Sequence, residues 1–147
     1  MTTTGVFKIS EAGTIALHAA VHLAARPDEV CSAHAMVEAL GVSGAHLVKV
    51  LQRLTRAGLV RPVRGPKGGF TLSRGADAIT LREVFEAIEG KLEPVQCLLR
   101  NRACDGKSCI LGGMVEKVNR ETLDYLHTTR LSKLVRVYGK EDKKRRR

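Results

Sequence analysis

The chain has 147 residues, and its 25 lysines and arginines exceed its 15 aspartates and glutamates by a formal net charge of +10. That length suits one domain with a modest core and a short appendage, and an aromatic content of 3% means that the core must be aliphatic. Because the sequence has neither a bilayer-spanning apolar run nor a signal-like N-terminus, it predicts a cytoplasmic protein with no membrane association. It argues against a secreted disulfide scaffold and a large multidomain enzyme. The positive charge favours a polyanionic partner, most simply nucleic acid.

The positive charge is concentrated in two places. Residues 140–147 hold six basic and two acidic residues, which predicts a disordered basic tail or a non-specific phosphate-binding arm. Between Glu38 and Asp77 there is no acidic residue. The basic residues of this stretch are Lys49, Arg53, Arg56, Arg61, Arg64, Lys67 and Arg74. This acid-free stretch is a local positive field, and it coincides with the clearest structural pattern in the chain.

Three helices are predicted in the first part of the chain. Apolar residues recur at helical spacing over residues 10–26, and a second short helix fits residues 32–40. Gly41 makes a turn, after which the hydroxyl of Ser43 can cap a third helix. The apolar stripe of this third helix is Leu47, Val50, Leu51 and Leu54, and the residues that can face outward are His46, Lys49, Arg53 and Arg56. Two short helices with cations on the second predict a helix-turn-helix.

A β-hairpin is predicted directly after these helices, over residues 59–72. Apolar, β-prone segments flank the turn RGPKGG, in which Arg64 and Lys67 lie beside glycines. Glycine lets the backbone approach another surface closely, and an arginine is attracted to a narrow minor groove. A hairpin in this position is typical of a DNA-binding wing, although a surface hairpin with solvated cations would show the same pattern.

Three of the four cysteines lie in or directly after residues 92–108, a segment whose apolar residues show no helical or strand period and which is therefore expected to be a loop. Cys97, Cys104 and Cys109 have the spacing C-x6-C-x4-C, which is long enough to fold three thiolates around one centre. The spacing alone leaves an iron–sulfur centre, a zinc site and free thiols open. Cys31 stands apart and is expected to be structural.

Two further helices are expected after the cysteines. The longer covers residues 110–126 and would include Cys109 near its start, with Ser108 as a cap, and the shorter covers residues 131–135, capped by Thr129. An amphipathic helix outside a compact headpiece needs a partner, and the simplest partner is the same helix in a second copy of the chain. The long helix therefore predicts a homodimer.

The segment GLVRPVRGPKGGFTL, together with RLTRAGLV before it and ITLREVFEAIEG after it, resembles the winged-helix regulators typified by IscR and NsrR. The resemblance covers nearly the whole chain except the basic tail. It implies a mostly α fold with a small β-hairpin wing and a long dimerisation helix, and a homodimer that binds palindromic double-stranded DNA. The expected division is a DNA-binding domain (residues 1–90), a cluster-binding loop (91–109), a dimerisation helix with a C-terminal helix (110–139) and a basic tail (140–147). The residues that the resemblance and the charge pattern assign to DNA contact are Ser43, Ala45, His46, Val48, Lys49, Arg53, Arg64 and Lys67.

The same resemblance implies that the three clustered cysteines hold an iron–sulfur cluster, [2Fe–2S] or [4Fe–4S]. A fourth ligand would come from the N-terminal helix of the partner subunit. His18 is the first candidate and Glu11 the second, while Thr14 stands where relatives have a carboxylate.

The resulting hypothesis is a homodimeric transcription regulator whose operator binding responds to redox state, nitric oxide or iron–sulfur status through its cluster. One alternative is a regulator of the same fold without a cluster, or with zinc, that senses thiols, metabolites or a partner protein. The other is a basic RNA-associated winged-helix protein. The sequence has no phosphate-binding glycine loop or nucleophile motif, so an enzyme is not expected.

Overall fold

The computed structural model of the chain describes residues 5–139, so the predicted basic tail lies outside the described residues. The elements in chain order are α1 (Glu11–Ala24), α2 (Ala33–Leu40), α3 (Gly44–Arg56), β1 (Val60–Val63), β2 (Gly69–Leu72), the 3-10 turn η1 (Ala76–Ala78), α4 (Leu81–Glu89), α5 (Met114–Thr128) and the 3-10 helix η2 (Leu131–Tyr138). The mostly helical fold with one small hairpin is therefore confirmed. No helix among residues 5–139 is long and apolar enough to cross a membrane.

Local side chains determine where the first helices begin and end. The hydroxyl of Ser10 accepts a hydrogen bond from the Gly13 N–H at 3.0 Å, and the hydroxyl of Ser32 accepts one from the Ala35 N–H at 3.1 Å. Each satisfies an amide that has no partner within its own helix. Gly41 ends α2 with φ of 66°, a left-handed conformation that glycine adopts without steric cost.

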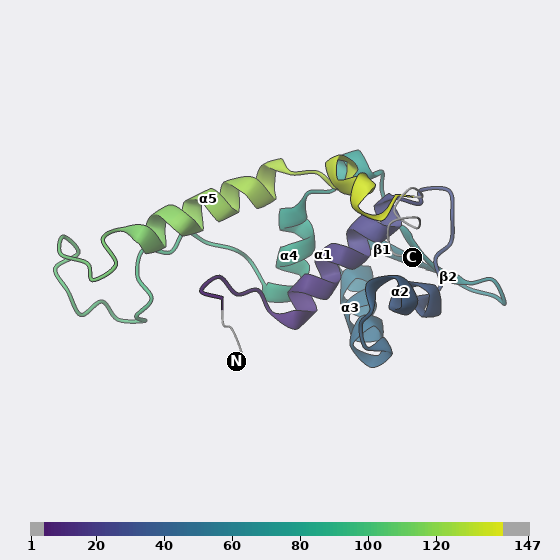
Figure 1. Ribbon diagram of the computed structural model, residues 1–147, viewed down its shortest axis with the longest axis horizontal. Coiled ribbons are helices and arrows are strands. Elements are labelled where there is room, and N and C mark those ends of the chain that lie inside the picture. The colour runs from purple at the N-terminus through teal and green to yellow at the C-terminus, as the bar shows by residue number, and fades with distance from the viewer. Residues whose placement is uncertain (1–4, 140–147) are drawn as a thin grey trace.

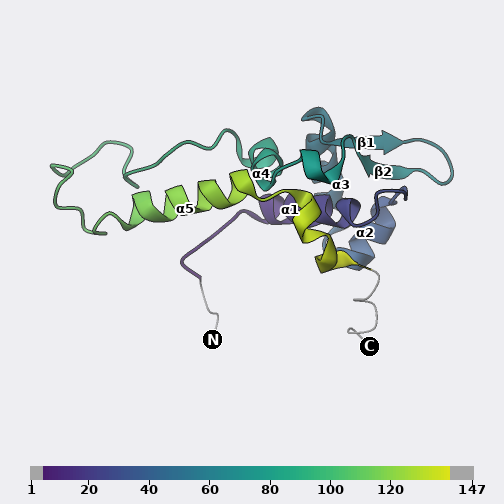
Figure 2. The same ribbon diagram turned by 90° about the horizontal axis from the view of Figure 1, so that it is seen from above.

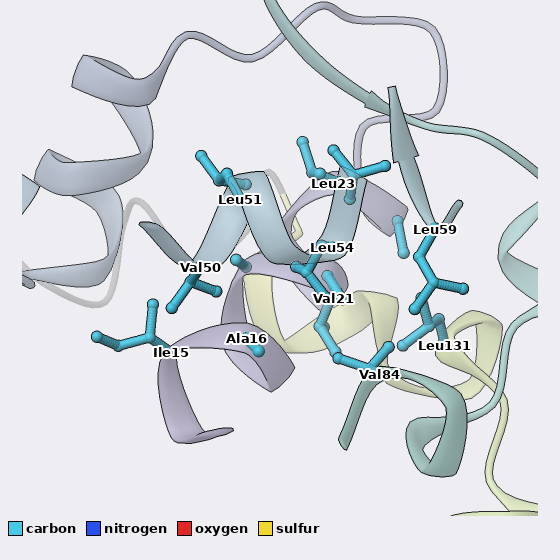
Figure 3. Close-up of a cluster of buried hydrophobic side chains, with 14 of the residues drawn as sticks. Ile15, Ala16, Val21, Leu23, Val50, Leu51, Leu54, Leu59, Val84 and Leu131 are labelled. Atoms are coloured by element: carbon cyan, nitrogen blue, oxygen red, sulfur yellow. The ribbon is translucent and has the colours of Figure 1, made fainter. Parts of the chain in front are cut away.

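The core is aliphatic, as the composition predicts. Helix α3 contributes Leu47, Leu51 and Leu54, each fully buried, and packs against α1, α2 and α4. Figure 3 shows how residues from separate elements meet in this core: Ile15, Ala16, Val21, Leu23, Val50, Leu51, Leu54, Leu59, Val84 and Leu131. Burial of this apolar surface fixes the orientation of α3, whose opposite side remains exposed.

The hairpin pairs β1 with β2 in antiparallel register, with Val60 opposite Leu72 and Val63 opposite Gly69. It is joined to the helices by Cys31, whose N–H and C=O both bond to the backbone of Phe70, at 3.0 and 2.8 Å. A Cβ at Gly69 would lie 2.3 Å from the Cys31 carbonyl oxygen, so this close approach requires glycine.

Helix α5 extends away from the headpiece and carries the cysteine-containing segment at its far end (Figures 1 and 2). Among the other helices and strands it packs mainly against α4, whereas η2 returns to the headpiece and packs against α1. The cysteine loop and the turn of the wing lie at opposite ends of the long axis of the molecule.

Two of the predicted helix caps are wrong. Ser43 occupies the N-cap position of α3, but its exposed hydroxyl makes no capping hydrogen bond, because water can satisfy both it and the first amides of an exposed helix start. Thr129 lies before the last helix, but Arg130 is its N-cap, and the Thr129 carbonyl instead accepts from the Leu81 N–H at 2.9 Å.

The predicted start of the long helix is also wrong. Helix α5 begins at Met114, so Cys109 lies in the loop before it and Ser108 does not cap it. Gly112 and Gly113 have φ of 58° and 78°, left-handed values that interrupt a right-handed helix. The glycine pair thus ends the loop and gives the cysteine a turn rather than a helical backbone.

Candidate functional site

The outward side of α3 presents one continuous row of exposed residues, Ala45, Lys49, Gln52 and Arg56, spaced by three or four positions. Val48 lies beside this row and is 41% exposed. Gln52 was missed by the sequence analysis, although its position three residues after Lys49 could have identified it. A glutamine on such a row can pair with the edge of an adenine.

His46 and Arg53 lie on the flank of α3 that faces other helices of the chain. The Nδ1 atom of His46 is 3.4 Å from the Oε1 atom of Glu11 in α1. The guanidinium of Arg53 donates to the Ile88 carbonyl at the C-terminal end of α4. The structure therefore gives both of these predicted DNA-contact residues a partner within the chain.

The wing places the two predicted cations of the turn, Arg64 and Lys67, on exposed backbone between β1 and β2. The Gly68 N–H bonds to the Gly65 carbonyl at 2.9 Å, and Gly65 has φ of 115°. Of the seven cations in the acid-free stretch, Arg74 is paired with Glu83 at 2.7 Å. Lys49, Arg56, Arg64 and Lys67 are all exposed, so α3 and the wing present a group of positive charges to solvent.

Cys97, Cys104 and Cys109 line one hollow of about 400 Å³ at the end of the α5 arm. The Cys97 sulfur accepts the Leu99 N–H at 3.4 Å. At Cys109, hydrogen bonds from the backbone N–H groups of Leu111, Gly113 and Gly112 and the charge of Arg102 lower the pKa of the thiol. Both features favour a thiolate, the form of cysteine that binds metals.

The loop around these cysteines is shaped by its own hydrogen bonds. The Oδ1 atom of Asp105 accepts from the N–H groups of Lys107 and Ser108 at 2.8 and 2.9 Å, which forms a turn between Cys104 and Cys109. Within residues 5–139, no three histidine, cysteine or carboxylate side chains converge closely enough to hold a single metal ion. The three cysteines therefore share a hollow but not a common point.

The two candidates for a fourth ligand lie on α1, away from this hollow. His18 is exposed, and its Nδ1 atom is 2.5 Å from the Tyr138 hydroxyl. Glu11 is engaged with His46. His22, one turn further along α1, is 3% exposed and packs against the Tyr138 ring.

The base of the cysteine loop is attached to two helices by side chains that the sequence analysis did not identify. The Leu92 N–H donates to Glu86 at 3.1 Å, and the Leu92 carbonyl accepts from Arg82 at 3.2 Å. Two residues before Cys97, the Val95 N–H donates to the side-chain oxygen of Asn119 in α5 at 3.0 Å. The loop is thus anchored to α4 and α5 just before its first cysteine.

Cys31 differs from the other cysteines in its surroundings. Its side chain is buried, and burial raises the pKa of its thiol. A buried neutral thiol is unreactive. This agrees with the expectation of a structural residue.

Comparison with known proteins identifies the family. Residues 9–137 match the family model Rrf2, which is described as an iron-dependent transcriptional regulator. The chain belongs to the Rrf2 family. This Rrf2 chain is 31% identical over 101 residues to a Neisseria meningitidis protein named as an HTH-type transcriptional regulator, which covers 69% of this chain and 68% of that protein. The relatives are regulators rather than enzymes, which confirms the prediction that this chain is not an enzyme.

Two further similarities concern IscR and CymR. The Rrf2 chain is 31% identical over 98 residues to IscR of Erwinia tasmaniensis, which covers 67% of this chain but 59% of IscR, less than two thirds of its length. Among solved structures, CymR, described as the global cysteine regulator of B. subtilis, superposes with a TM-score of 0.75 at 25% identity, over 90% of this chain and 98% of CymR. IscR of T. potens superposes with a TM-score of 0.71 at 24% identity, over 89% and 88%, which is a likeness of fold.

Proposed function

We propose that the chain acts as a homodimeric regulator whose binding to operator DNA is controlled by an iron–sulfur cluster on Cys97, Cys104 and Cys109. The observation that carries this proposal is the arrangement of the three thiols around one hollow, with backbone N–H groups directed at two of the sulfurs. Such N–H groups stabilise anionic sulfur. An iron–sulfur cluster would bring redox chemistry and sensitivity to nitric oxide to this position.

The family resemblance favours a cluster over a single zinc ion at the three cysteines. Structural zinc takes its ligands at one tetrahedral point. A cluster binds its thiolates through different iron atoms, so the sulfurs need not converge. The three described cysteines line one hollow, so thiolates around it would each bind an iron atom of one cluster. IscR among the relatives, and the iron-dependent description of the family, support the same cofactor.

The duplex partner follows from the positive surface of α3 and the wing. Lys49, Gln52 and Arg56 would enter the major groove with the outward row of α3, while Arg64 of the wing would reach the minor groove. Two copies of α3 must lie about 34–36 Å apart to dock on successive turns of one duplex face. Anything that changes the angle between the two subunits therefore changes operator affinity.

Dimer formation is favoured by the exposed apolar side chains of α5 and the loop before it. The most exposed of them are Leu98, Leu99, Ile110, Met114, Val118 and Tyr125. Several exposed apolar side chains on an extended helix favour its burial against a second copy of that helix. Helix α1 lies in the headpiece, away from the segment that carries the cysteines (Figure 1). A ligand from α1 would therefore have to come from the partner subunit.

The cofactor assignment is tested by purifying the full chain without air and measuring its visible absorbance, iron and acid-labile sulfide. We expect a brown protein with iron and sulfide in matched amounts, and loss of both in Cys97→Ser, Cys104→Ser and Cys109→Ser. Cys31→Ser serves as the matched control and should keep both. A colourless anaerobic protein with stoichiometric zinc would refute the assignment.

A second function is favoured by the surroundings of Cys109. Its lowered pKa, the exposure of Cys104 and the similarity to CymR support a thiol-based sensor without a cluster. Metal-free protein whose DNA affinity changes on oxidation, and no longer does so in Cys109→Ser, would establish this alternative.

A further inference from the structure

We propose that Arg53 is a positioning residue that ties the recognition helix α3 to the base of the cysteine loop, rather than a contact to DNA phosphate. Its role in carrying a signal from the loop rests on the function proposed above, whereas its role in holding α3 does not.

The first step is the hydrogen bond that Arg53 makes. Its guanidinium donates to the carbonyl of Ile88, the second-last residue of α4. The last carbonyls of a helix have no partner in that helix, and the helix dipole favours a cation at this end. Arg53 therefore stabilises the end of α4, and this bond holds its guanidinium against that helix.

The second step is the position of Arg53 on α3. It lies seven residues after His46, hence on the same flank, and His46 is paired with Glu11 of α1. These two contacts hold one side of α3 at points two turns apart. Lys49 lies four residues before Arg53 and so borders this flank, whereas Gln52 lies further round the helix. Among the described residues His46 and Arg53 each have a partner on another helix, whereas Lys49 has none.

The third step is what else meets at the end of α4. Glu89, the next residue, accepts a hydrogen bond from Ser10, which caps α1. Just beyond it, Leu92 is held by Arg82 and Glu86 of α4. A displacement of the loop base is thus passed to α4, and through the Ile88 carbonyl to Arg53 and α3.

The experiment compares Arg53→Gln with Lys49→Gln, which each remove one positive charge from α3. The DNA is a duplex that the protein selects from a randomised pool. The affinity of each variant for this duplex is measured at several salt concentrations, and the slope of log affinity against log salt concentration is compared. Each phosphate contact contributes about −0.9 to the slope. We expect Arg53→Gln to keep the wild-type slope and Lys49→Gln to lose about one contact. A slope that falls by that amount in Arg53→Gln would overturn the positioning role.

The coupling is tested by adding the triple substitution of Cys97, Cys104 and Cys109 to serine in each background. We expect it to change wild-type and Lys49→Gln affinity by about tenfold, a usual size for coupling between sites, and Arg53→Gln affinity by less than about threefold. The full wild-type change in Arg53→Gln would overturn the coupling. If the triple serine substitution leaves the affinity of the wild type unchanged, the loop does not control DNA binding, and the proposed coupling through Arg53 is wrong as well. The salt slope still decides whether Arg53 is a positioning residue.

If Arg53→Gln does not fold, nitrogen-15 NMR of the arginine side chains in the wild type answers the same question. We expect the Arg53 signal to stay in place when the selected duplex is added and to differ between the wild type and the triple serine variant. A large shift on duplex addition, or identical signals in those two proteins, would contradict the proposal.

Discussion

At the residue scale, His22 shows how burial changes the chemistry of a side chain. Its ring lies in the core beside Tyr138, and its Nδ1 atom has no hydrogen-bond partner among the described residues. Burial, together with the charge of Arg26 and against that of Glu29, lowers the pKa of His22 from 6.5 to about 4. The folded protein therefore keeps this histidine neutral where the unfolded chain would be protonated.

The pKa of His22 predicts a pH-dependent stability. The unfolded chain binds a proton below about pH 6.5 and the folded chain only near pH 4, so the free energy of unfolding falls as the pH drops through this window. The loss amounts to about 3 kcal/mol at most. Urea unfolding at pH 7, 6, 5 and 4 should show a steeper decline in the wild type than in His22→Leu. The exposed His34→Gln is the control, and equal declines in all three proteins would contradict the prediction.

The close contact at Gly69 predicts that adding one methyl group at the base of the wing destabilises the fold. In Gly69→Ala the Cβ would meet the Cys31 carbonyl, so the two backbones must separate. We expect the free energy of unfolding to fall by more than about 2 kcal/mol. Gly44→Ala is the matched control, because its Cβ meets nothing nearer than 3.7 Å and a helical alanine stabilises by up to about 1 kcal/mol. Equal effects of the two substitutions would show that the contact at Gly69 does not constrain the wing.

At the element scale, the attachment of the cysteine loop to α4 depends on Glu86. Its two carboxylate oxygens accept from the Arg82 side chain at 2.6 Å and from the Leu92 N–H at 3.1 Å. Glu86→Ala should lower the free energy of unfolding by about 1–2 kcal/mol, since both donors lose their partner. It should also speed tryptic cleavage within residues 97–109. Glu93→Ala, an exposed change in the same loop, is the control, and equal cleavage rates would contradict this attachment.

The elements also show what a sequence can predict. The helices around Leu47 and Ile15 and the hairpin around Gly65 were predicted because apolar periodicity and turn residues act over short distances. The start of α5 was missed because Gly112 and Gly113 adopt left-handed conformations that an apolar pattern does not reveal. The partners of His46 and Arg53 were missed because they come from α1 and α4, which only the tertiary fold brings to α3.

At the scale of the whole molecule, the exposed apolar residues of α5 predict that the protein is a dimer. Val118 is 43% exposed on this helix, whereas the adjacent Lys117 is polar and exposed. Val118→Asp should raise the dimer dissociation constant by about a hundredfold if α5 pairs with a second copy, because it buries a charge in an apolar interface. Light scattering on Val118→Asp and on the control Lys117→Asp measures the difference. A monomeric wild type, or two variants that dimerise equally, would contradict the proposed dimer.

The three cysteines lie at the far end of the α5 arm, away from α3 and the wing (Figure 2). If α3 and the wing bind DNA as proposed, control by the cysteines must pass through α4 and α5 or through the partner subunit. The most direct test is the affinity of the anaerobically purified protein for its selected duplex, measured before and after an iron chelator removes the iron. We predict an affinity change of about tenfold or more in the wild type and in Cys31→Ser, and none in Cys104→Ser. Equal affinity of the iron-loaded and iron-free wild type would contradict control of DNA binding by a cluster at Cys97, Cys104 and Cys109.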